Sequence, residues 1–164
     1  MNPSYSIVPL HSGLDRSAFR CGSEELDDYF RHRVSQDVRR GATACFVLLS
    51  GEERITGFYT LASTSLMLAD LPDFVAKKLP RYPLVPAVLM GRLAVDSKNA
   101  RQGLGGVLLA DALARVRRSE IAACALVVDA KDEAAAAFYL HHGFIRLQDR
   151  RNTLFLPVRR NAIS

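Results

Sequence analysis

The chain has 164 residues, a net charge of +5 at neutral pH, 49% hydrophobic residues and 24% charged residues. These values are typical of one globular domain with a sizeable core and exclude a largely disordered chain, so we expect a single domain over residues 1–164. The longest apolar runs, such as Val85–Met90, are far too short to span a bilayer. Met1–Gly13 lacks the basic and apolar segments of a signal peptide, so we expect a cytoplasmic protein without a membrane partner.

The cysteines give no sign of a disulfide framework or a metal site. Cys21, Cys45 and Cys124 are odd in number, scattered, and form no C-x-x-C pair. The four histidines show no spacing typical of metal ligands either. We therefore expect no metal, and free thiols in a reducing compartment.

The basic residues gather in short clusters along the chain. A positive field of this kind favours a polyanionic partner, such as nucleic acid or a nucleotide cofactor, although solvated surface arginines explain it equally well. The clusters are Arg39–Arg40, Lys77–Lys78 with Arg81, Arg115 with Arg117–Arg118, Arg150–Arg151 and Arg159–Arg160.

The first part of the chain predicts a strand, a helix and an antiparallel hairpin. Ser6–Leu10 is a short strand, and Ser23 caps a helix that ends at Gly41. The apolar stripe of this helix recurs at every fourth residue and consists of Leu26, Phe30, Val34 and Val38. The runs Ala44–Leu49 and Ile55–Leu61 flank a short loop and form the hairpin.

The second part of the chain predicts alternating strands and helices. Residues 63–86 hold four prolines and are less regular, with a short helix near Phe74–Leu79. The elements that follow are a strand at Val88–Val95, a helix at Leu104–Arg118, a strand at Ala125–Val128, a helix at Asp132–His141 closed by Gly143, and strands at Phe144–Leu147 and Thr153–Leu156. Antiparallel strands followed by this alternation predict an α/β fold with a mixed sheet and helices packed on it.

A glycine-rich turn begins the helix that follows Val88–Val95. Gly103, Gly105 and Gly106 let a ligand approach the backbone closely, and the free N–H groups of a helix start attract an anion. The turn is therefore a candidate cradle for a pyrophosphate, together with the N–H groups of Arg101 and Gln102. No G-K-[ST] follows, so it is not a Walker A loop, and the full Rossmann spacing is missing too.

A second candidate segment is the Ala-rich helix that ends in Phe138-Tyr139 before Gly143-Phe144. Taken alone, Tyr139 is a packed tyrosine with its hydroxyl at the rim. The two segments together, L-A-V-D-x5-Q-G-L-G and A-x-x-F-Y-x-x-x-G-F, resemble the pattern of the GNAT family of acetyltransferases.

The resemblance implies the GNAT fold, a mixed and mostly antiparallel sheet flanked by helices, with acetyl-coenzyme A as co-substrate. It implies backbone contacts from the first segment to the pantetheine arm and the pyrophosphate, with oxyanion donors near its start. The cofactor-binding residues would be Leu93, Ala94, Val95, Arg101, Gln102, Gly103, Leu104, Gly105 and Gly106. Tyr139 would be the catalytic acid that protonates the departing thiolate. Two departures from the pattern, Ala100 and Glu133, concern side chains and leave the backbone cradle intact.

A narrower resemblance covers most of the chain. Several segments are similar to the GNAT toxins of toxin–antitoxin pairs: Phe19–Gly22 with Leu26 and Tyr29-Phe30, Gly57–Leu61, Pro80–Pro83, Gly91–Asp96 and Thr153–Pro157. This similarity implies an enzyme that acetylates the α-amine of aminoacyl-tRNA and blocks translation. It also implies a ribbon-helix-helix antitoxin as partner, and a homodimer.

Acid–base chemistry agrees with an aminoacyl ester as acceptor. A lysine amine with a pKa of ~10.4 needs a strong base. An α-amine starts at a pKa of ~7.7–8.0, and the adjacent ester lowers this pKa further, so the nucleophile is already substantially neutral. No Glu or His occupies a position in the sequence that identifies it as such a base. The candidate residues for tRNA phosphates are Arg39, Arg40, Lys77, Lys78, Arg81, Arg92, Arg150 and Arg151, with a structural role for Arg92 equally open.

Two other functions stay open at this point. One is a small-molecule or protein N-acetyltransferase, although a cationic acceptor favours an acidic groove and the chain is basic. The other is a non-catalytic nucleic-acid-binding co-repressor that keeps the fold.

Overall fold

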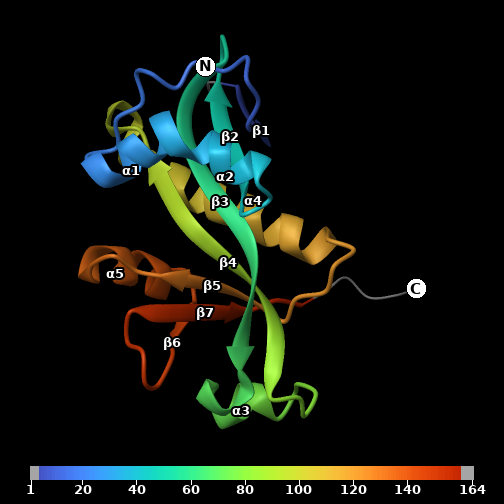
Figure 1. Ribbon diagram of the computed structural model, residues 1–164. Helices are drawn as coiled ribbons and strands as arrows, with labels where there is room; N and C mark the ends of the chain where they lie inside the picture. The colour runs from blue at the N-terminus through green and yellow to red at the C-terminus, as the bar shows by residue number, and fades with distance from the viewer. Residues whose placement is uncertain (1–3, 160–164) are drawn as a thin grey trace. The chain divides into compact units, whose positions relative to one another are not determined.

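The computed structural model describes residues 4–159, which form a seven-stranded sheet with helices (Figure 1). The strands are β1 (Tyr5–Pro9), β2 (Ala44–Ser50), β3 (Arg54–Met67), β4 (Leu84–Val95), β5 (Ala125–Asp129), β6 (Ile145–Arg146) and β7 (Thr153–Pro157). The helices are α1 (Glu24–Asp28), the π-helix η1 (Tyr29–Arg33), α2 (Val34–Arg39), α3 (Asp73–Ala76), α4 (Leu104–Arg118) and α5 (Glu133–His141), with 3-10 turns η2 (Leu68–Asp70) and η3 (Ser97–Asn99).

The sheet has the order β1-β2-β3-β4-β5-β7-β6. β1 pairs with β2, β2 with β3, β5 with β7 and β6 with β7, all antiparallel, whereas β4 and β5 are parallel. The predicted mixed, mostly antiparallel sheet flanked by helices is therefore confirmed. No helix within residues 4–159 combines the length and the apolar character that crossing a bilayer demands.

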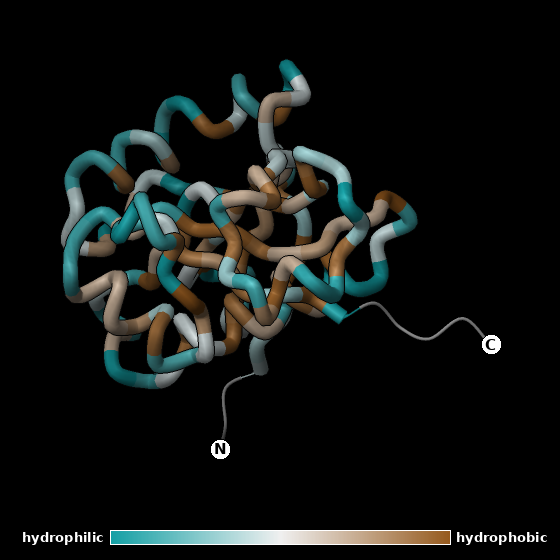
Figure 2. Tube along the Cα trace, turned by 90° about the horizontal axis from the view of Figure 1, so that it is seen from below, coloured by the Kyte–Doolittle hydropathy of each residue, from teal (hydrophilic) through white to brown (hydrophobic). Residues whose placement is uncertain are grey.

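The chain divides into two compact units. The first comprises the residues up to Ala62 together with Gly91–Ala112, and the second comprises Ser63–Met90 together with the residues from Leu113 on. β3, β4 and α4 each begin in one unit and end in the other. In Figure 2 the outlying loops are mostly hydrophilic, and the hydrophobic residues concentrate in the interior segments.

Each unit has its own core. In the first, the rings of Phe19, Phe30 and Phe58 pack together, with Phe30 stacked on Phe58 at 4.1 Å between centroids. In the second, Phe155 and Val127 lie in a cluster of buried apolar side chains from several strands and from α3. Ring stacking and aliphatic burial thus form two separate apolar clusters.

The predicted helix from Ser23 to Gly41 is confirmed as one helical run over residues 24–39, but its middle is not α-helical. Ser23 does cap α1, with its Oγ accepting the Leu26 N–H (3.3 Å), and Gly41 follows α2 with φ +74°. Between α1 and α2, η1 has wider π turns, with the Val34 N–H donating to the Tyr29 carbonyl. Apolar residues at every fourth position drift around an α-helix of 3.6 residues per turn, and the wider turn restores their alignment with the core.

The strands β3 and β4 are longer than the sequence predicted, and α3 is shorter. Residues 63–67 continue β3, and β4 begins at Leu84 rather than Val88. The prolines misled the prediction because proline lacks an N–H but keeps its acceptor carbonyl. The carbonyl of Pro83 accepts the Leu68 N–H and that of Pro86 accepts the Cys124 N–H, at 2.9 and 2.8 Å.

Gly57 on β3 lies at a close packing contact of the first unit. A Cβ on this residue would lie 3.0 Å from both the Ala94 carbonyl oxygen and the Leu108 Cδ1 atom. Glycine therefore lets β4 and α4 approach β3 without a clash.

We predict that Gly57→Ala lowers the free energy of unfolding by about 1–3 kcal/mol, because the added methyl overpacks this contact. Urea unfolding of the variant and of the wild type measures the change. Gly51→Ala is the control, since a Cβ there meets no atom within 4 Å, and it should change stability by less than ~0.5 kcal/mol. Equal stability of the two variants would contradict the packing argument.

Candidate active site and cofactor cradle

The loop between β4 and α4 is held at its start by the buried side chain of Asp96. The Asp96 N–H donates to the Thr56 carbonyl (2.8 Å), which ties the end of β4 to β3. Its carboxylate accepts the backbone N–H groups of Lys98 (2.9 Å) and Arg20 (3.2 Å). Hydrogen bonds to N–H groups satisfy a buried carboxylate, so this loop leaves the strand in a fixed direction.

Two residues of the loop have left-handed backbone conformations. Arg101 has φ +65° and Gly103 has φ +75°, and such a value is uncommon for a residue with a side chain. The Val107 N–H donates to the Gly103 carbonyl (3.2 Å) and begins the bonding of α4. Backbone strain of this kind is typical of ligand sites, where it turns N–H groups toward a bound group.

The first turn of α4 leaves backbone donors available. Within residues 4–159, no protein acceptor takes the N–H groups of Leu104, Gly105 and Gly106. They carry the positive end of the helix dipole, and a Cβ on the preceding Gly103 would meet no atom within 4 Å. The cradle predicted from the glycines thus has the donors and the open space that a diphosphate requires.

The predicted tyrosine lies in the second unit. Tyr139 belongs to α5, whose N-cap Asp132 accepts the Ala135 N–H (2.8 Å). Its side chain is 8% exposed, and its ring lies 5.2 Å from those of Phe138 and Phe144. No group in the described part of the chain hydrogen-bonds its hydroxyl. Burial raises the pKa of Tyr139 to about 12, so the phenol keeps its proton at neutral pH and can donate it.

The predicted basic residues divide between the units. Arg39 and Arg40 are exposed at the end of α2 in the first unit, which also contains Arg92. The second unit exposes Lys77, Lys78, Arg81, Arg150 and Arg151. Of the remaining cluster Arg159–Arg160, only Arg159 belongs to the described residues.

Arg92 is half-buried against the ring of Tyr29, a contact that the sequence did not predict. Its guanidinium carbon lies 3.4 Å from the centroid of Tyr29, whose hydroxyl donates to Asp37 (2.7 Å). Its backbone N–H donates to the Thr60 Oγ1 atom (3.1 Å). Burial, followed by the hydrogen bond to Asp37, raises the pKa of Tyr29 to about 12. Arg92 therefore has a structural contact, which holds its side chain in one place by a cation–π interaction.

Comparisons with known proteins identify the family. The model of the acetyltransferase (GNAT) domain matches residues 88–157. A tRNA-acetylating toxin of Mycobacterium tuberculosis is 40% identical over 132 residues, which cover 79% of this chain and 78% of the toxin. The chain belongs to the GNAT acetyltransferases, in the family of tRNA-acetylating toxins. Both resemblances found in the sequence are thereby confirmed.

Solved structures of such toxins have the same fold. AtaT complexed with acetyl-methionyl-tRNAfMet is 31% identical and superposes with a TM-score of 0.87 over 94% of this chain and 95% of that chain. A Tyr-to-Phe mutant of the AtaT toxin, bound to the C-terminus of the antitoxin AtaR and to acetyl-CoA, is 28% identical with a TM-score of 0.79 over 93% and 92% of the two chains. The described residues of the present acetyltransferase contain no group of metal-binding side chains.

We predict that Tyr139 makes the acetyltransferase less stable in alkaline solution. With a pKa of about 12 in the folded state and ~10 in the unfolded state, the folded protein retains a proton that the unfolded chain loses. The free energy of unfolding should therefore fall by up to ~1.4 kcal/mol per pH unit as the pH rises from 10 toward 12.

Tyr139→Phe lacks this titration, so its stability should fall less over the same range. Urea unfolding of both proteins at about pH 9 and pH 11 measures the difference, and the shifted pKa of Tyr29 is common to both. Parallel losses in the two proteins would contradict the burial of an ionisable Tyr139.

Proposed function

We propose that this acetyltransferase transfers the acetyl group of acetyl-CoA to the α-amine of aminoacyl-tRNA and thereby blocks translation. The observation that carries the proposal is the anion cradle at the start of α4, in a chain that is 40% identical to a tRNA-acetylating toxin. The complex of AtaT with acetyl-methionyl-tRNAfMet supports the same class of acceptor. Since tRNA is a cytoplasmic substrate, we propose a cytoplasmic location as well.

The proposed cofactor site follows the backbone from β4 into α4. The main chain of Leu93–Val95 contacts the pantetheine arm, and residues 101–106 hold the pyrophosphate on their N–H groups. Acetyl-CoA, when bound, supplies an activated thioester carbonyl to the acceptor amine. Because the holding groups are backbone N–H groups, their arrangement depends on the left-handed turns at Arg101 and Gly103 rather than on particular side chains.

The proposed reaction needs a neutral amine, donors for the developing oxyanion and a proton for the leaving group. The α-amine starts from a pKa of ~7.7–8.0, and the adjacent ester lowers this pKa further, so a substantial share of the amine is neutral without a strong base. Main-chain N–H groups of Leu93–Val95 stabilise the negative charge on the carbonyl oxygen. As the N–C bond forms and the C–S bond breaks, Tyr139 gives its proton to the departing sulfur. The proton that the attacking nitrogen loses returns to the Tyr139 oxygen and restores the phenol.

The remaining proposals concern the tRNA-binding residues, the antitoxin, the oligomeric state and the number of domains. The basic residues that we propose for tRNA phosphates are Arg39, Arg40, Lys77, Lys78, Arg81, Arg92, Arg150 and Arg151. An antitoxin of the ribbon-helix-helix class neutralises the enzyme, in keeping with the AtaT–AtaR complex, and the enzyme is a homodimer. Both units of the chain form one catalytic domain, since three elements run through both.

We predict that radiolabelled acetyl passes from acetyl-CoA to charged tRNA and to neither uncharged tRNA nor a lysine peptide. The reason is that only the charged tRNA offers a neutral α-amine beside a polyanionic body. Scintillation counting of precipitated tRNA and of the peptide gives the answer. Label on the peptide alone would contradict aminoacyl-tRNA as the acceptor and would indicate a protein acetyltransferase.

We predict that Tyr139→Phe lowers turnover by ~10²–10⁴-fold with acetyl-CoA affinity unchanged, because it removes only the acidic hydroxyl. Single-turnover acetylation and calorimetric titration with acetyl-CoA separate the two quantities. Tyr82→Phe, which removes a hydroxyl from a side chain that is 68% exposed, is the control and should retain wild-type turnover. Equal turnover of Tyr139→Phe and wild type would remove Tyr139 from the mechanism.

A further inference from the structure

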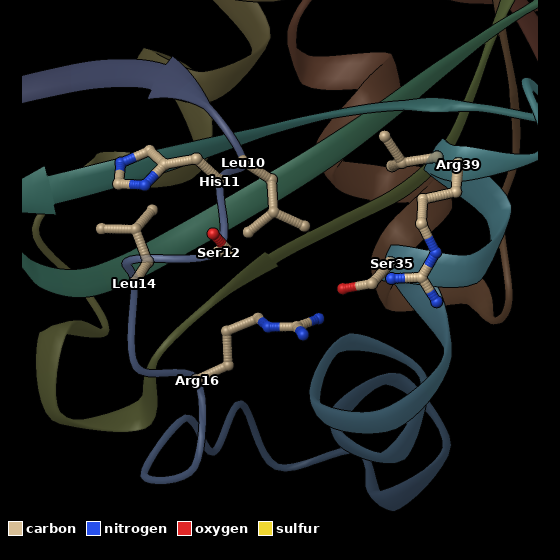
Figure 3. A pocket seen from close by; sticks show the side chains of 8 residues that line it. Leu10, His11, Ser12, Leu14, Arg16, Ser35 and Arg39 are labelled. Carbon is tan, nitrogen blue, oxygen red and sulfur yellow. The ribbon is translucent and has the colours of Figure 1, made fainter.

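A recess in the first unit lies apart from the cofactor cradle in sequence. It has a volume of about 240 Å³ and opens between the loop after β1 and the helix α2 (Figure 3). The loop contributes Leu10, Ser12 and Arg16, and α2 contributes Ser35 and Arg39. This volume is below the ~300–1,000 Å³ of most drug-sized ligand sites, so the recess suits a small group rather than a whole cofactor.

Two guanidinium groups share this recess. Figure 3 shows the side chains of Arg16 and Arg39 directed into the same space, with the Ser35 hydroxyl between them in this view. Arg16 is fixed in place, because its Nη1 atom donates to the Phe30 carbonyl (2.7 Å) and its guanidinium lies 5.8 Å from the Phe30 ring centroid. The recess thus has one immobilised cation, one exposed cation and a hydroxyl in its lining.

The positive charge of the recess has no partner within the described residues. No carboxylate between residues 4 and 159 forms an ion pair with Arg16 or Arg39. The two acids nearest in sequence are engaged elsewhere. Asp15 accepts the N–H and the hydroxyl of Ser17 (2.9 and 2.7 Å), and Asp37 accepts the Tyr29 hydroxyl (2.7 Å). An anion entering the recess therefore displaces no internal ion pair.

The chemistry of the recess selects an oxyanion that carries an apolar part. Planar guanidinium groups bind phosphate through paired N–H donors, and a hydroxyl adds one further donor. Leu10, Leu14 and Val38 supply an apolar floor on which a sugar ring can lie. His11 completes the rim, where its Nδ1 atom accepts the Gly13 N–H (3.2 Å).

We propose that this recess binds a backbone phosphate of RNA, with the adjoining ribose on the apolar floor. RNA is favoured over an isolated anion because Arg40 continues the positive surface beside Arg39, and the chain carries a net charge of +5. The identity of the RNA as a tRNA rests on the function proposed above, whereas binding of the phosphate does not require acetyl transfer. Arg16 and Ser35 thereby join the RNA-binding residues.

The test compares matched substitutions inside and outside the recess. Arg39→Gln removes one cation from it, and Arg54→Gln removes one exposed cation at the far end of β2. Arg54 pairs with Ser50, the last residue of β2. The recess adjoins the other end of this strand, where the N–H of Leu10 donates to the Cys45 carbonyl (2.9 Å). Ser35→Asp puts a carboxylate into the lining of the recess, and Gln36→Asp adds the same charge on an exposed neighbour outside the recess.

The measurement is fluorescence anisotropy of uncharged tRNA with each full-length variant over a series of salt concentrations. We expect Arg39→Gln to weaken binding about tenfold and to reduce the slope of log K against log salt by about one. Ser35→Asp should weaken binding at least as much, whereas Arg54→Gln and Gln36→Asp should leave the affinity within about twofold of wild type. Unchanged acetyl-CoA affinity in all four variants establishes that they are folded.

Equal losses in the recess variants and in their controls would overturn the proposal, because the effect would then follow net charge alone. Failure of the wild type to bind uncharged tRNA would overturn it too. A loss of binding to a poly-glutamate peptide but not to tRNA would reassign the recess to an acidic peptide. Absence of acetyl transfer to charged tRNA, with these binding differences intact, would refute the proposed function and leave the phosphate site standing.

Discussion

The buried carboxylate of Asp96 is the constraint on which the proposed cofactor cradle depends. It joins three segments of the first unit, because its backbone N–H reaches β3 while its oxygens hold the N–H groups of Arg20 and Lys98. The strained turn at Arg101 and the open donors of α4 come directly after this junction. A flexible loop at the same place would lose conformational freedom each time it bound a diphosphate, whereas a fixed one has lost it during folding.

Much of the fold follows from local patterns, and the exceptions have identifiable physical causes. α4 begins and ends at the residues that the sequence predicted, because glycines precede it and one apolar stripe continues through it. The π turn at Tyr29–Arg33 escaped prediction, since periodicity is read against an α-helix. The early start of β4 escaped it because Pro83 and Pro86 serve as acceptors at positions where no N–H is needed.

The site residues divide in the same way into those that a short segment of sequence identifies and those that only contacts between distant segments identify. The glycine cradle and Tyr139 each lie in a short segment whose residues carry the signal together. The recess around Arg16 and Ser35 has no such signal, because its residues come from separate elements and are individually ordinary surface types. The contact between Tyr29 and Arg92 was not predicted for a similar reason, since Arg92 lies on a distant strand. Contacts between elements become visible only once the chain is folded.

The three buried tyrosines of the chain differ in what their hydroxyl groups do. Tyr29 donates to Asp37 and Tyr59 to Asp111, so each phenol is committed to a carboxylate inside the fold. Tyr139 alone has no such partner among residues 4–159. A committed phenol would have to exchange one hydrogen bond for another before it engaged a ligand, with little net gain. Tyr139 exchanges only a contact with water for any bond that it makes to a bound molecule, so no bond within the described fold has to break first.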